Sequence, residues 1–118
     1  MTPQERVLSW RAEIAAELEE AVKLVPPLED AHATAAAAAQ AALDDYGAVQ
    51  RLIGSTVPNP ETPIRRRSDD HARELDQAKS KRARAFADLQ AARSNVTSLQ
   101  RALAQIDRVI PPADEEAA

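Results

Sequence analysis

The chain has 118 residues, a net charge of −4 and no cysteine, and 44% of its residues are hydrophobic although only 3% are aromatic. These features exclude a disulfide framework and a thiolate metal site, and two glycines are too few for a phosphate-binding loop. Alanine is abundant, so high helix propensity is combined with little apolar area to bury. This balance favours a two-layer α-helical rod over a globule.

The first element is predicted to be a helix over residues 3–53. Thr2 is suited to cap it, Pro3 suits the first helical position, and Glu5 completes a capping box. Apolar or small residues then recur at alternating steps of three and four from Val7 to Ile53, with Arg11 as one polar gap. An average step of 3.5 residues is typical of a helix that lies along a neighbouring helix. We call these recurring positions the seam.

Pro26 and Pro27 interrupt the first helix. They remove two helical hydrogen bonds, and Pro27 disfavours α geometry at Pro26, so we expect a kink there. Val25 and Leu28 nevertheless keep the seam in phase, which predicts a bend between roughly collinear helices. The alternative is a three-helix bundle with helices near 3–25, 28–53 and 63–110.

A connector is predicted over 54–62, where Gly54 suits a helix C-cap and three prolines prevent a helix from continuing. A second seam runs from Ile64 to Ile110, and the prolines that follow end the predicted helix of 63–110. The acidic tail 113–118 is predicted to be disordered. We therefore expect one all-α domain over 1–112, a long antiparallel helical hairpin that resembles a coiled coil.

Folding back at the connector predicts that residues whose numbers add up to about 117 lie opposite each other. Residues 1–53 carry a net charge of −5 and residues 62–110 a net charge of +5, so the two arms attract. The seam is expected to depend on its larger apolar residues: Ile14, Leu18, Leu89, Val96, Leu99, Leu103 and Ile106.

The apolar face of the first arm is broader than one partner helix can cover, because large residues flank its seam. Alanines are common on protein surfaces, so only the larger apolar side chains beside the seam indicate a partner. We predict that a protein, either a second copy or a larger assembly, covers them: Trp10, Leu24, Leu43 and Leu52.

His32 and His71 both fall on seam positions, where a histidine usually forms a polar layer or sets the register. Asp70, His71 and Glu74 share a helical face that could loosely hold a divalent metal, but the opposite arm offers no matching histidine. We therefore expect no metal. The absence of a nucleophile–base–acid set and of any known catalytic motif predicts a protein that is not an enzyme and takes no cofactor or small-molecule substrate.

Basic residues concentrate in segment 65–84, beginning with Arg65, Arg66 and Arg67. These arginines are candidates for anion contact, and a nucleic-acid-associated factor is the alternative function. Acidic residues alternate with them along the same helix, which favours a solvated, charged face.

We therefore expect a soluble structural or assembly protein, made in the cytoplasm, that acts as an oligomer through helical packing and does not enter a membrane. Alanine-rich rods without cysteine are common among phage virion and virion-assembly components, so incorporation into a virion is one expectation.

Two families offer partial likenesses. Tyr46-Gly47 resembles the turn of secreted helical hairpins, which makes a small secreted hairpin a further alternative. Val57-Pro58-Asn59-Pro60 resembles the turn of the needle subunits of bacterial injection machines. Each likeness covers the turn alone, so the chain is assigned to neither family.

Overall fold

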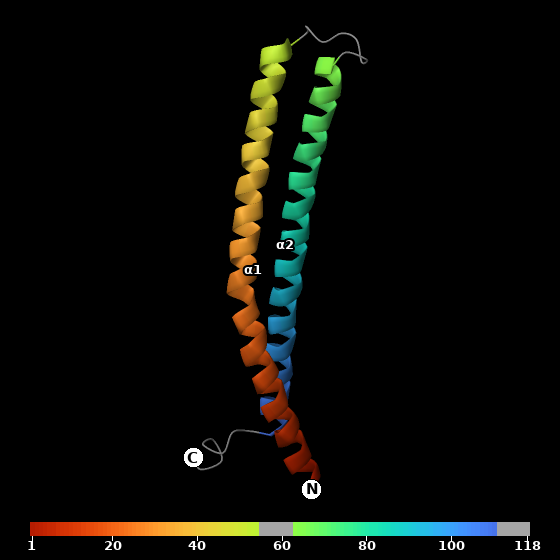
Figure 1. Ribbon diagram of the computed structural model, residues 1–118. Coiled ribbons are helices and arrows are strands. Elements are labelled where there is room, and N and C mark those ends of the chain that lie inside the picture. Colours follow the sequence, from red (N-terminus) through yellow and green to blue (C-terminus); the bar gives the residue numbers. More distant parts are fainter. Residues whose placement is uncertain (55–62, 111–118) are drawn as a thin grey trace. The chain divides into compact units, whose positions relative to one another are not determined.

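The computed structural model describes residues 1–54 and 63–110, which form two long helices (Figure 1). Helix α1 spans Pro3–Ile53 and helix α2 spans Pro63–Val109, and the part of the chain so described contains no strand. The two helices pack as an antiparallel hairpin, as the seam periodicity predicts. The predicted arms agree with the observed helices to within one residue. The rest of the predicted connector and the predicted tail lie outside the described residues.

Both ends of α1 form as the sequence predicts. The backbone N–H of Glu5 donates to Thr2 Oγ1 at 3.1 Å, which satisfies one of the free donors at the start of α1. At the other end of α1, Gly54 has a φ of +46°, the left-handed conformation that glycine adopts without a steric penalty.

Helix α1 continues without a break through Pro26 and Pro27, which excludes the three-helix alternative. The prolines remove the hydrogen bonds that would reach the carbonyl groups of Val22 and Lys23. Both of these residues are exposed, so water can take the place of the missing donors. The helix therefore tolerates two prolines that propensity alone would place at a helix end.

The chain divides into two compact units. The first joins Met1–Leu28 to the chain from Leu89 onward, and the second is Glu29–Asp88. Each unit consists of one stretch of α1 packed against one stretch of α2. The single domain over 1–112 remains a prediction.

Contacts within each unit confirm the predicted register. In the first unit Arg11 pairs with Asp107, and the two residue numbers add up to 118. In the second unit Gln50 Nε2 donates to Ser68 Oγ at 2.8 Å, which gives the same sum of 118. The predicted sum of about 117 is thus correct to one residue.

The buried residues of each unit lie at seam positions. Ala21 and Leu89 are 5% and 3% exposed in the first unit, and Ala39 and Leu75 are 4% and 6% exposed in the second. Most other predicted seam residues are half-buried, including those expected to stabilise the pair: Ile14, Leu18, Val96, Leu99, Leu103 and Ile106. One helix covers only one side of the other, so among the described residues no side chain is less than 2% exposed.

Two seam positions depart from the pattern. Ile64 is 52% exposed and Arg82 is also exposed, although both fall on the predicted phase of α2. Ile64 is the second residue of its helix, where few neighbours exist to cover it. Arg82 lies opposite Ala36 in the observed register, and an alanine is too short to cover an arginine.

Candidate protein-interaction surfaces

Heptad positions describe which side chains flank the seam. With Arg11 and Ile14 at positions a and d of α1, position e lies beside a, and position g lies beside d. The large apolar residues of α1 that remain at least 43% exposed, the terminal Met1 aside, all occupy these two flanks. Position e holds Leu8, Val22 and Leu43, and position g holds Trp10, Leu24 and Leu52.

In the first unit, the g flank of α1 borders an open groove between the helices. Trp10 is 51% exposed and Leu24 is 60% exposed, and Glu17 lies midway between them in sequence. The groove has a volume of about 470 Å³, and its lining includes Leu24, Glu17 and Ala21 from α1 and Leu99 from α2. Apolar side chains exposed beside a groove are typical of a surface that binds protein.

In the second unit, exposed apolar groups come from both helices. Leu43 of α1 is 43% exposed and Phe86 of α2 is 48% exposed. With Ser68 and His71 at positions a and d of α2, Phe86 occupies position e. The rings of Phe86 and His32 lie 5.5 Å apart, and Gln50, at position e of α1, reaches Ser68. These contacts place the e flanks of α1 and α2 on the same edge of the unit.

All four predicted interface residues are exposed: Trp10, Leu24, Leu43 and Leu52. The heptad separates them, however, because Leu43 lies on the e flank and the other three lie on the g flank. Their role as an interface remains a prediction. Sequence reasoning overlooked Phe86, although assigning heptad positions to both arms would have placed it beside the seam.

His71 forms a polar layer within the second unit, as expected of a seam histidine. Its Nε2 lies 2.8 Å from Asp45 Oδ2 on α1, and its ring lies 5.4 Å from the ring of Tyr46. Its Nδ1 is buried and has no hydrogen-bond partner among the residues that the structure describes. The contacts with α1 fix the position of His71 opposite residues 45 and 46. This arrangement helps to set the register of the second unit.

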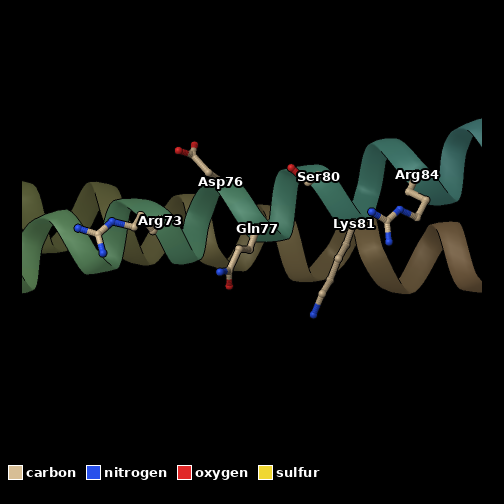
Figure 2. Close-up of a pocket in the computed structure, with 6 residues that line it drawn as sticks. All are labelled: Arg73, Asp76, Gln77, Ser80, Lys81 and Arg84. Atoms are coloured by element: carbon tan, nitrogen blue, oxygen red, sulfur yellow. The ribbon is translucent and has the colours of Figure 1, made fainter.

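Acidic residues of α2 lie among the basic residues of segment 65–84. Arg65 Nε lies 3.4 Å from Asp69 Oδ1, and Arg73 Nη1 lies 2.9 Å from Asp70 Oδ1. A shallow pocket of about 440 Å³ lies along α2, and Figure 2 shows the side chains that line it. The side chains lining it fan out along the helix and do not converge on one point: Arg73, Asp76, Gln77, Ser80, Lys81 and Arg84. A single bound anion would require convergent donors.

An ion pair joins the two helices in the first unit. Arg11 Nε donates to Asp107 Oδ1 at 2.7 Å, and both side chains are more than a third exposed. The hydrogen bond from Arg11 lowers the pKa of Asp107 below its usual value; the partial loss of solvent around the carboxylate opposes this shift, and the positive charge of Arg11 adds a smaller lowering. This pair reverses the general polarity of the arms, because its cation is on the acidic arm.

Within residues 1–54 and 63–110, no group of three or more histidine or acidic side chains is placed to hold a metal ion. Neither described helix contains a stretch apolar and long enough to cross a membrane. Comparison with protein-family models, curated proteins and solved structures finds no match. The interpretation of function therefore depends on the surfaces described above.

Proposed function

We propose that the protein is a non-enzymatic structural or assembly protein that acts by packing the exposed flanks of its helices against other protein chains. The observation that supports this proposal is the placement of large apolar residues at both flanks of the α1 seam. Isolated exposed apolar residues are ordinary, but six confined to two flanking heptad positions extend the apolar stripe of α1 beyond the width that α2 covers.

The thin core of each unit favours the same interpretation. Of the four residues that are most buried, two are alanines, which remove little apolar area from water. Association with a further chain would bury the half-exposed seam and its flanks together. Further copies of this chain, alone or within a larger assembly such as a virion, are the partners that we expect.

Self-association can be measured by sedimentation together with the fluorescence of Trp10, the single tryptophan. The sedimenting mass should rise with protein concentration, and the emission of Trp10 should shift to shorter wavelength as its ring leaves water. The variant Trp10→Ser/Leu24→Ser should stay monomeric with unchanged helix content. Ser9→Gln, an exposed change on the same stretch of α1, serves as the matched control and should associate normally.

A wild-type protein that sediments as a monomer at every concentration would contradict the proposal. The alternative function, nucleic-acid association through Arg65, Arg66 and Arg67, predicts binding to DNA that weakens steeply as salt is added. The acids that follow these arginines on α2, Asp69 and Asp70, form ion pairs with arginines of the same helix and do not favour that alternative.

A further inference from the structure

Two surfaces of the hairpin carry apolar groups together with opposite charges. We define the acidic surface, in the first unit, as Trp10, Glu13, Glu17 and Leu24. Trp10, Glu17 and Leu24 are spaced seven residues apart at position g, and Glu13 lies one turn before Glu17. All four side chains are exposed.

We define the basic surface, in the second unit, as Leu43, Lys79, Arg82 and Phe86. Lys79 and Phe86 are spaced seven residues apart at position e of α2, and Leu43 is at position e of α1, on the same edge. Arg82 lies between Lys79 and Phe86 at an exposed seam position. All four side chains are exposed.

The charges on both surfaces are available to a partner. The side chains of four charged residues make no ion pair or hydrogen bond with the described part of the chain: Glu13, Glu17, Lys79 and Arg82. Some charged side chains of the acidic arm and of the basic arm are therefore not paired between α1 and α2. An isolated exposed ion pair contributes little, but several together with apolar burial select a partner and its orientation.

The two surfaces also match in layout. On the acidic surface, two glutamates lie between Trp10 and Leu24, which are separated by about 21 Å along the helix. On the basic surface, Phe86 lies opposite His32, so that about 16 Å separates it from Leu43 along the helix axis. Lys79 and Arg82 lie between these two apolar groups. The difference in length is within the reach of tryptophan and phenylalanine side chains.

We infer that the acidic surface of one copy binds the basic surface of the next copy. Each surface repels a second copy of itself, because like charges would meet at its centre, and each attracts the other surface. Such an interface is heterologous, and repetition of it links copies head to tail. This inference rests on the proposed function and specifies how self-association takes place.

Variants with one inactivated surface test this inference by sedimentation. Trp10→Ser/Leu24→Ser removes the apolar groups of the acidic surface, and Leu43→Ser/Phe86→Ser removes those of the basic surface. Each variant alone should remain monomeric at concentrations where the wild-type protein associates. An equimolar mixture should form a complex of two chains and grow no further, because one intact surface of each kind is present.

A second pair of variants keeps the apolar groups and changes only exposed charges. Any loss of association in these variants is therefore not caused by loss of apolar packing or of folding. Glu13→Lys/Glu17→Lys and Lys79→Glu/Arg82→Glu reverse the exposed charges of one surface each. Each should weaken association at least about tenfold, and mixing the two should restore it. Helix content measured by circular dichroism should equal that of the wild-type protein throughout.

The outcomes separate the two proposals. A wild-type protein that never associates contradicts the proposed function and this inference together. If the wild-type protein associates but either serine variant alone still forms dimers of the same strength, association does not require the acidic surface of one copy to meet the basic surface of the next. The head-to-tail inference is then wrong, and the proposed function stands. A mixture of the serine variants that remains monomeric beside an associating wild-type protein also overturns the inference alone.

Discussion

Truncation of Leu89 provides the most direct test of the seam. Leu89 is 3% exposed, the lowest value among the buried residues of the two helices. Leu→Ala removes three carbon groups, and each contributes about 0.8 kcal/mol when it is fully buried, or about 2.4 kcal/mol in total. A cavity left in the seam would add to this cost, although the half-exposed neighbours can move inward to fill part of it. We expect Leu89→Ala to lower the free energy of unfolding by about 2–3 kcal/mol.

Leu52→Ala is the matched control, because it makes the same chemical change at a residue that is 85% exposed. The same arithmetic gives a loss of about 0.4 kcal/mol at this position. Urea unfolding followed by circular dichroism, at concentrations where the protein is monomeric, measures both values. Equal losses for the two variants would show that burial in the seam does not stabilise the hairpin, and the packing argument would then be wrong.

Two further predictions concern polar groups between the helices. The Arg11 hydrogen bond lowers the pKa of Asp107 in the folded state, so ionised Asp107 stabilises the folded protein. This stabilisation is fully present above the pKa of about 3.8 that Asp107 has in the unfolded chain, and it is lost as the pH falls through the lower pKa of the folded state. The wild-type protein should therefore melt at a higher temperature than the Asp107→Asn variant, by the largest margin near neutral pH and by a smaller margin below about pH 4. A margin that does not change with pH would contradict the assignment of this hydrogen bond. His71→Leu should raise the free energy of unfolding by about 1 kcal/mol, since it removes a buried Nδ1 that has no partner in the described part of the chain and leaves the exposed Asp45 in water. Denaturant unfolding measures this change, and a destabilised variant would show that the contact with Asp45 outweighs the unpartnered atom.

The two surfaces could be predicted only in part from the sequence. Trp10 and Leu24 are recognisable because they are large apolar residues beside a regular seam. Phe86 gives a weaker signal, because it is surrounded by charged and small residues and is recognised as a flank residue only when heptad positions are assigned to α2 as well. The exposure of Arg82 likewise depends on the short Ala36 opposite it.

The sequence by itself determined the fold, the two helices, their ends and their register. It could do so because these depend on local chemistry and on one repeating pattern: capping residues, prolines, high helix propensity and apolar spacing of 3.5 residues. The tertiary structure decided that α1 continues through Pro26 and Pro27, where the residues that lose a hydrogen-bond donor are exposed to water. It also decided that Arg11 pairs with Asp107, and that the side chains of Glu17 and Lys79 have no partner within residues 1–54 and 63–110. Such pairing depends on the rotation and separation of two helices, which bring together residues far apart in sequence, and local propensity carries no information about it.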